Sequence, residues 1–218
     1  MSLTLYSHPF SSYCQKVLIA LWENETPFTN RNLEEPGAAE ERAALWPLGR
    51  FPVLVDDGRA IAESSIIIEH LDRRHRGRVS MLPDDRDAAL EVRFMDRFFD
   101  NYIMTPMQKP VAEALRGEQA TRKEEALAEA RQALDAAYGW LEGRLDGRTW
   151  ATGESFTMAD CAAAPSLFYA DWVHQIGPDF PRLRQYRARL LARPSFARAV
   201  EEARPYRAYF PLGAPDRD

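Results

Sequence analysis

The sequence predicts two successive parts, an α/β unit with a mixed four-stranded sheet followed by an all-helical bundle. Strand and helix patterns alternate over roughly the first 80 residues. An Asp57-Gly58 pair separates two short apolar runs there, and every strand pattern ends before residue 86. We therefore expect an α/β domain at 1–80, a linker at 81–85 and a helical domain at 86–218.

The elements expected in the α/β unit follow the order β-α-β-α-β-β-α. Apolar spacing predicts strands at 3–6 and 28–33, helices at 11–23 and 40–46, a hairpin at 52–61 and a last helix from 66 onward. Asp-Gly is typical of a two-residue hairpin turn. The strand-helix-strand start implies a parallel pair with a right-handed crossover. A serine before Ile66 is expected to cap the last helix.

The second part carries only helical spacing. Helices are expected at 86–108, 121–145, 157–173, and around 183–190 and 196–200. Thr157, with Asp160 three residues later, resembles a capping box. We therefore give both residues a structural role at a helix start.

The composition of the chain argues against several classes of protein function. The formal net charge of −5 argues against a nucleic-acid-binding protein. No apolar run reaches the roughly 20 residues that cross a bilayer, and the first residues lack the pattern of a signal peptide. Two cysteines are too few for a disulfide scaffold or a zinc site. The four histidines show no metal-ligand spacing, so each is expected to be exposed or capping, and no metal is expected. These features favour a cytoplasmic protein.

The corner after the first strand reads Ser11-Ser12-Tyr13-Cys14. In thioredoxin-type domains this corner holds Cys-x-x-Cys, whose first thiolate the helix N-terminus stabilises. Here the first position is Ser11, whose hydroxyl can donate a hydrogen bond to the thiolate of a ligand. The alternative is that Ser11 or Ser12 only caps the helix.

Two further segments suggest ligand contacts. Phe51-Pro52 opens a strand and is a candidate cis peptide whose backbone could pair with an extended peptide. Glu63 and Ser64 stand at the start of a predicted helix. The N-terminus of that helix can bind a carboxylate, and Glu63 can bind an ammonium group. Pro52 would then be structural, and the alternative for Glu63-Ser64 is an ordinary helix cap.

An apolar pocket is the third expected feature. Its candidate residues are apolar side chains of the second part together with one at the first corner, namely Phe98, Tyr102, Met104, Met107, Trp172 and Phe10. Aromatic residues at helical spacing commonly form core instead.

Taken together, these segments resemble the soluble glutathione S-transferase superfamily over nearly the whole chain. The most specific pieces are the segments at 47–54, 63–67 and 155–160, with a tail like the family's last helices at 180–183 and 193–196. The resemblance implies a thioredoxin-like glutathione domain followed by a helical domain. It is strongest to the serine-type branches, which are named theta and zeta.

The resemblance also implies roles for individual residues. Ser11 matches the serine that hydrogen-bonds the glutathione thiolate, Phe51 the residue before the family's cis-proline, and Glu63 and Ser64 the γ-glutamyl site. Arg50 aligns with a position near the glycyl carboxylate. Tyr13 replaces the cysteine of the zeta signature, which counts against that branch's isomerase activity.

The function implied is transfer of glutathione, as co-substrate, to a small hydrophobic electrophile, a detoxification reaction carried out by a homodimer. Crowding of apolar residues around the helix expected at 86–108 adds modest support for the dimer. The alternative is a catalytically weak member that serves as a binding or interaction module.

Overall fold

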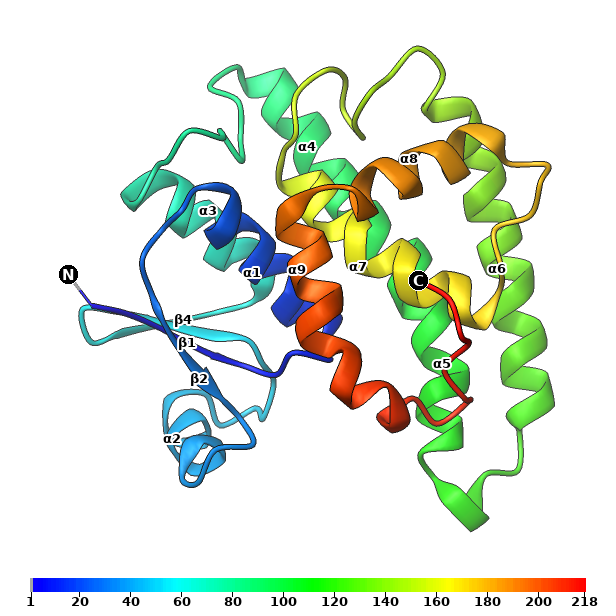
Figure 1. Ribbon diagram of the computed structural model, residues 1–218, viewed down its shortest axis with the longest axis horizontal. Helices are drawn as coiled ribbons and strands as arrows, with labels where there is room; N and C mark the ends of the chain where they lie inside the picture. Colours follow the sequence, from blue (N-terminus) through cyan, green and yellow to red (C-terminus); the bar gives the residue numbers. More distant parts are fainter. Residues whose placement is uncertain (1) are drawn as a thin grey trace.

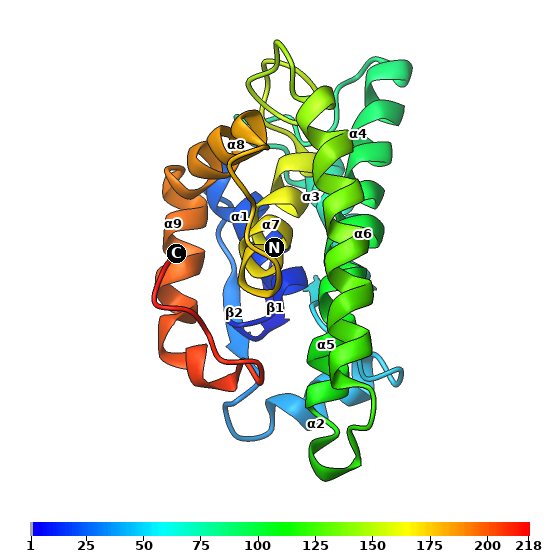
Figure 2. The same ribbon diagram turned by 90° about the vertical axis from the view of Figure 1, so that its right-hand side faces the viewer.

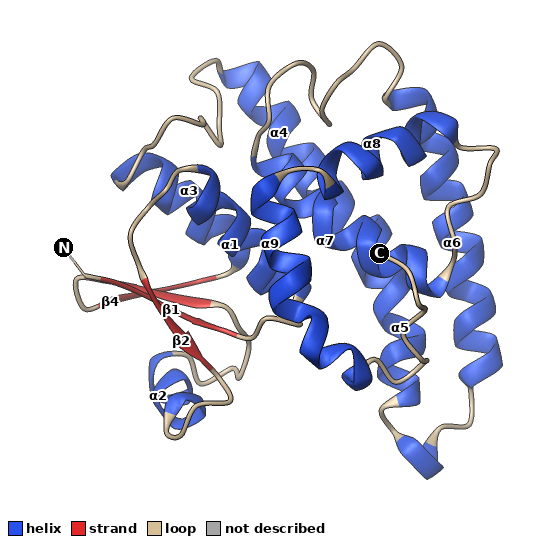
Figure 3. Ribbon diagram, viewed as in Figure 1, coloured by secondary structure: helices blue, strands red, loops and turns tan. Residues whose placement is uncertain are grey.

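The computed structural model describes residues 2–218, and it has the fold class that the sequence predicts, an α/β part followed by a helical part (Figure 3). The strands gather in one region formed by the first third of the chain, and helices make up the rest. This is the thioredoxin-like α/β arrangement followed by a helical bundle. The helices and strands of the first part are β1 (Leu3–Ser7), α1 (Ser12–Glu23), β2 (Thr29–Asn32), α2 (Ala38–Leu45), β3 (Val53–Asp56), β4 (Arg59–Ala62) and α3 (Ser64–Arg74).

The sheet has the order β2-β1-β3-β4. β1 pairs parallel with β2 and antiparallel with β3, and β3 pairs antiparallel with β4. The hairpin turn lies at Asp57 and Gly58, which both have positive φ, 46° and 84°. Positive φ at both central residues is what a type I′ turn requires, so the prediction from Asp-Gly is confirmed.

Helices cover both faces of this sheet (Figure 1). α1 and α3 lie on one face and α2 on the other. α1 is almost wholly buried, because it also contacts two helices of the second part. The helices of that part are α4 (Arg86–Phe98), a π-helical stretch η1 (Phe99–Met104), α5 (Thr105–Ala114), η2 (Gly117–Gln119), α6 (Lys123–Arg144), α7 (Met158–Val173), α8 (Pro181–Leu191), α9 (Pro194–Ala203) and η3 (Arg204–Tyr209).

α7 is the central helix of the bundle. Figure 2 shows it between the α5–α6 pair and α9. Thr157 is its N-cap residue and Asp160 stands three residues on, which confirms the capping box. The Asp160 carboxylate is fully buried and accepts hydrogen bonds from the Thr157 N–H (2.9 Å), the Ala151 N–H (2.9 Å) and the Tyr186 hydroxyl (2.6 Å).

Two predictions about helices need correction. The segment expected as one helix at 86–108 continues to Ala114 and contains the π-helical stretch, which hydrophobic spacing does not reveal. The N-cap of α3 is Glu63, without a side-chain cap bond, and Ser64 is its first helical residue. Among the described residues, no helix is both long and apolar enough to cross a bilayer.

Candidate active site

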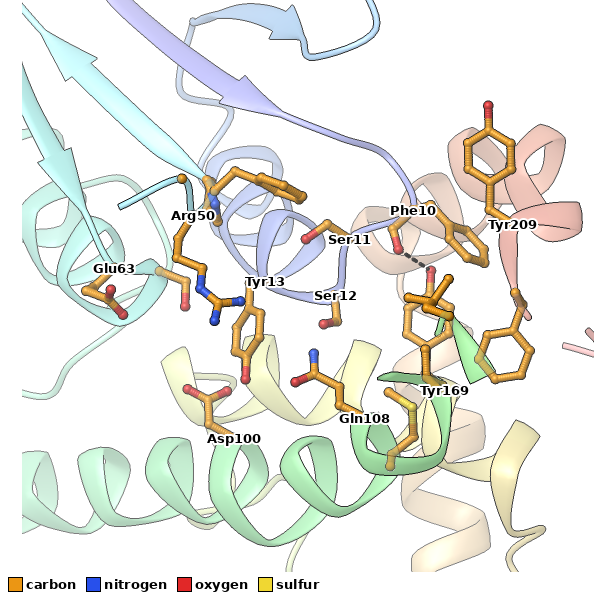
Figure 4. Close-up of a pocket in the computed structure, with 18 of the residues that line it drawn as sticks. Phe10, Ser11, Ser12, Tyr13, Arg50, Glu63, Asp100, Gln108, Tyr169 and Tyr209 are labelled. Carbon is orange, nitrogen blue, oxygen red and sulfur yellow. Dashed lines mark hydrogen bonds between the residues drawn. The ribbon is translucent and has the colours of Figure 1, made fainter. Parts of the chain in front are cut away.

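A cavity of about 680 Å³ opens between the thioredoxin-like part and the helical part. Its polar side comes mainly from the α1 corner, the loop before β3 and the start of α3 (Figure 4). Its apolar side comes from the helical part and the C-terminal segment. The polar and aromatic residues lining the first side are Ser11, Ser12, Tyr13, Trp46, Arg50, Phe51, Glu63, Ser64, Arg97, Asp100 and Asn101.

Ser11 is the N-cap of α1 and faces this cavity. Its hydroxyl oxygen accepts a hydrogen bond of 3.4 Å from the Cys14 backbone N–H. A hydroxyl has one hydrogen to donate besides its acceptor lone pairs. Ser11 therefore caps the helix while keeping a donor for a group in the cavity, and the two sequence-based alternatives are compatible.

Two neighbouring hydroxyls also reach the cavity. In Figure 4 the Ser12 side chain faces Gln108, and the Tyr13 ring extends toward Asp100. Burial, followed by the nearby Asp100 carboxylate, raises the pKa of Tyr13 to about 12. Tyr13 is thus a neutral phenol near neutral pH and acts as a hydrogen-bond donor rather than as a base.

Cys14 is fully buried and does not line the cavity. Its sulfur accepts a hydrogen bond from the His8 backbone N–H at 3.4 Å. Burial raises the pKa of Cys14 to about 12, so the thiol stays protonated near neutral pH. Because the thiolate is the reactive form, Cys14 is inert in the folded chain.

Tyr6 and Ser7 are the last two residues of β1, just before this corner, and Tyr6 points away from the cavity. The Tyr6 side chain lies on the other side of β1, where its hydroxyl donates to the Glu41 carboxylate at 3.1 Å. Ser7 is fully buried and bonds to Asn30. Neither residue lines the cavity.

The loop before β3 brings Arg50 and Phe51 to the cavity. The Phe51-Pro52 peptide is cis, as the sequence suggested. Arg50 is exposed, and Figure 4 shows its guanidinium extending between Glu63 and Tyr13. It therefore places positive charge on the polar side of the cavity.

Glu63 and Ser64 complete the polar side at the start of α3. Glu63 is exposed and has a φ of 70°, a region that residues other than glycine rarely adopt. Such strain is typical of functional positions. Ser64 is buried at the first helical position, where backbone N–H groups and the helix dipole favour an anion.

A buried ion cluster lies beside the site and joins the two parts of the chain. The Lys16 ammonium on α1, only 1% exposed, lies 2.6 Å from an Asp96 oxygen and 2.9 Å from an Asp100 oxygen. Arg97 contacts both carboxylates and the Ser65 hydroxyl. Two positive and two negative charges compensate one another, which makes the burial of Lys16, Asp96 and Asp100 tolerable, while the Arg97 side chain stays half-exposed. Asp100 and Arg97 also line the cavity, so this cluster fixes one of its walls.

The apolar side differs from the sequence-based prediction. Phe10 and Met107 do line the cavity, but Phe98, Tyr102, Met104 and Trp172 do not. Phe98 stacks on Trp140 with ring centroids 4.4 Å apart, and Tyr102 is exposed. Trp172 packs against neighbouring aromatic rings in a separate small hollow. Helical spacing identifies an apolar face, but it does not tell which neighbour that face contacts.

The residues that do form the apolar side include several that the sequence did not single out. They come from α5, α7 and the C-terminal segment, and they are Met107, Val111, Leu115, Tyr169, Tyr209, Phe210 and Pro211. The Tyr169 hydroxyl donates to the Phe10 carbonyl at 3.2 Å and accepts from Gln15 at 3.0 Å. Arg97, Asp100, Asn101 and Gln108 are further polar lining residues that sequence reasoning missed. No local motif marks them, because the contact between the two parts brings them in.

Comparison with known families shows which superfamily the chain belongs to. A family model described as the glutathione S-transferase N-terminal domain matches residues 5–79, and one described as the C-terminal domain matches residues 124–189. The chain belongs to the glutathione S-transferase superfamily.

Individual relatives of this glutathione S-transferase superfamily member carry different names. FtsZ-localized protein A of Caulobacter vibrioides is 27% identical over 88% of each chain. A stringent starvation protein A homolog of Haemophilus influenzae is also 27% identical, over 93% of this chain and 92% of the relative. A solved glutathione S-transferase of Methylobacillus flagellatus, with glutathione bound, has a TM-score of 0.76 and 26% identity over 91% of this chain and 98% of its own.

Proposed function

We propose that this protein is a glutathione transferase that joins the glutathione thiolate to a small hydrophobic electrophile. The observation that carries the proposal is the two-sided cavity. Its polar side holds hydroxyls, charges and a helix N-terminus, its apolar side holds aliphatic and aromatic side chains, and the two sides meet near Ser11. A charged tripeptide and an apolar partner would be held next to each other there.

The polar side offers a partner for each charged end of glutathione. The N-terminus of α3 at Ser64 suits the γ-glutamyl carboxylate, and the adjacent Glu63 suits its ammonium group. The backbone of Phe51 suits the central cysteinyl residue. Arg50 suits the glycyl carboxylate, since guanidinium groups pair well with carboxylates.

The sulfur would then lie at the start of α1. We assign the Ser11 hydroxyl as the donor to the thiolate, with the N-terminal end of the α1 dipole adding electrostatic help. The neutral Tyr13 phenol is a second donor on the same wall. Stabilising the charged form of the thiol raises the fraction of reactive nucleophile without a covalent intermediate.

The test combines binding with turnover. Calorimetry should show glutathione binding, and a panel of apolar electrophiles, including aryl halides, isothiocyanates and enones, should give conjugates by mass spectrometry. Binding with turnover of at least one electrophile supports the proposal. Absence of glutathione binding would refute it.

A second candidate function is an interaction module that binds glutathione without efficient turnover. The similarity to FtsZ-localized protein A and to a stringent starvation protein A homolog favours it, because those names describe location and stress response. Binding without turnover of any electrophile on the panel would support this second function over the first.

We also place this activity in a cytoplasmic homodimer with domains at 1–80 and 86–218. The dimer is supported by exposed apolar side chains that lie together on α4, η1 and α6, namely Leu90, Phe94, Tyr102 and Trp140. The Phe94 and Trp140 rings are in edge contact, with centroids 5.9 Å apart. The two free cysteines fit a reducing compartment.

A further inference from the structure

Two histidines and an aspartate converge in the thioredoxin-like part, away from the cavity. Asp56 is the last residue of β3, His70 lies on α3, and His75 is the C-cap residue of α3. One oxygen of Asp56, Oδ2, lies 2.7 Å from His70 Nε2 and 2.9 Å from His75 Nε2. None of the three side chains lines the candidate active site.

All three side chains are largely withdrawn from solvent, with exposed fractions between 12% and 15%. Their donor atoms all lie within 4.8 Å of one another. The spacing of His70 and His75 is not a familiar metal motif, and the third donor comes from a strand that is distant in sequence. The sequence therefore predicted no ligand set here.

We propose that Asp56, His70 and His75 form a binding site for a first-row divalent cation of the zinc type. Two imidazole nitrogens and one carboxylate oxygen are a donor set that zinc accepts. Three protein ligands leave a fourth tetrahedral position for water. Hard cations such as Mg²⁺ prefer oxygen ligands and should not compete.

Metal binding requires an adjustment of all three side chains. Zinc–nitrogen and zinc–oxygen bonds of about 2.0–2.1 Å place neighbouring tetrahedral ligands about 3.3 Å apart. The two Nε2–Oδ2 distances, 2.7 and 2.9 Å, would therefore lengthen by roughly half an ångström. The donor nitrogens of the two histidines, which lie within 4.8 Å of one another, would approach to about the same 3.3 Å by side-chain rotation. Each imidazole would carry its proton on Nδ1, which frees the Nε2 lone pair for the metal.

The position of the cluster indicates a structural role for the ion. It would fasten the C-terminal end of α3 to the end of β3, next to the hairpin turn. The N-terminus also reaches this turn, because Ser2 exchanges backbone and side-chain hydrogen bonds with Asp57. Figure 1 shows α3 and the hairpin on the side of the molecule opposite α5 and α6.

The test uses the untagged full-length chain after removal of metals by a chelator. Calorimetry with Zn²⁺ alone should show one ion bound per chain with a dissociation constant in the micromolar range or below. Zn²⁺ should also raise the melting temperature, because it binds only the folded site. Co²⁺ should give the intense visible bands of a tetrahedral site, and Mg²⁺ should give none of these responses.

His70→Gln and Asp56→Asn should each weaken Zn²⁺ binding about 100-fold or more, since even loss of an outer partner costs 10–100-fold. The matched control is His174→Gln, because His174 forms an isolated pair with Asp135 at 2.7 Å. That variant should bind Zn²⁺ like the parent. Failure of the parent chain to bind Zn²⁺, or equal affinity in the double variant His70→Gln/His75→Gln, would overturn the proposal. The melting temperatures without metal show whether a variant has lost its fold instead.

Discussion

In the proposed reaction, the Ser11 hydroxyl is the group that donates a hydrogen bond to the glutathione thiolate. Its oxygen accepts the Cys14 N–H at the start of α1, and its hydrogen is available to a sulfur in the cavity. The cap bond is long at 3.4 Å, so its contribution to stability is at the low end of the usual range, about 0.5 kcal/mol. The functional consequence of losing this hydroxyl should therefore exceed the structural one.

We predict that Ser11→Ala slows conjugation about ten-fold or more and changes glutathione affinity much less. A ten-fold loss corresponds to about 1.4 kcal/mol, an ordinary value for one hydrogen bond to a charged group. Steady-state kinetics with one electrophile, beside calorimetry with glutathione, measures both quantities. Ser12→Ala is the matched control and should stay close to the parent. If Ser12→Ala conjugates slowly and Ser11→Ala conjugates at the parent rate, then Ser12, and not Ser11, is the donor to the thiolate.

The two cysteines should be unreactive in the folded protein. Cys14 and Cys161 are both fully buried, and burial raises the pKa of each thiol above its usual range. Because a raised pKa keeps the thiol protonated up to higher pH, iodoacetamide at about pH 8 should leave both unmodified. Mass spectrometry should find no adduct on the folded chain and two on the denatured chain. Rapid modification of Cys14 in the folded chain would show that its thiol is accessible and ionised, against this prediction.

At the scale of elements, the start of α3 is the feature on which glutathione affinity should depend. Replacing Glu63 with glutamine removes the partner of the ligand's ammonium group while keeping size. We expect glutathione to bind about ten-fold more weakly, because Glu63 is exposed and a solvated charge pair is worth less than a buried one. Calorimetry measures this loss. Glu40→Gln, on exposed α2, serves as the control, and an unchanged affinity in Glu63→Gln would refute the γ-glutamyl assignment.

The start of α7 should dominate stability rather than activity. Asp160→Ala would leave the donors of Thr157, Ala151 and Tyr186 buried without their acceptor. We expect a loss of about 3–5 kcal/mol in the free energy of unfolding, measured by urea denaturation. Tyr186→Phe removes only one of these donors and should cost about 1 kcal/mol. If both variants cost the same small amount, the buried capping network is not a major source of stability.

The elements also show how far the sequence predicts this structure. Alternation and turn residues predict the sheet and the hairpin, because both signals are local. The π-helical stretch at Phe99–Met104 escaped prediction, since it depends on how neighbouring helices pack. Corners and caps are local signals, and residues chosen from them, such as Ser11 and Glu63, do line the cavity. Phe98, Tyr102 and Trp172 lie outside it, because helical spacing does not show which neighbour a helix face contacts.

At the scale of the whole molecule, the exposed apolar side chains on α4, η1 and α6 predict self-association. Sedimentation at micromolar concentration should give a dimer. Phe94→Asp should yield a monomer, because it places a charge among the apolar residues of that surface. Leu115→Asp is the control, since Leu115 is also exposed but lies at the cavity. A monomeric parent protein, or a dimeric Phe94→Asp variant, would contradict the proposed interface.

We propose that the cavity between the two parts binds glutathione and ionises its thiol. The most direct measurement is the ultraviolet absorbance of the thiolate in the binary complex, titrated against pH without an electrophile. We predict that bound glutathione ionises about one pH unit or more below free glutathione, a shift worth about 1.4 kcal/mol per unit. In Ser11→Ala most of that shift should disappear. An unshifted titration in the parent complex, or an equal shift in Ser11→Ala, would contradict the claim.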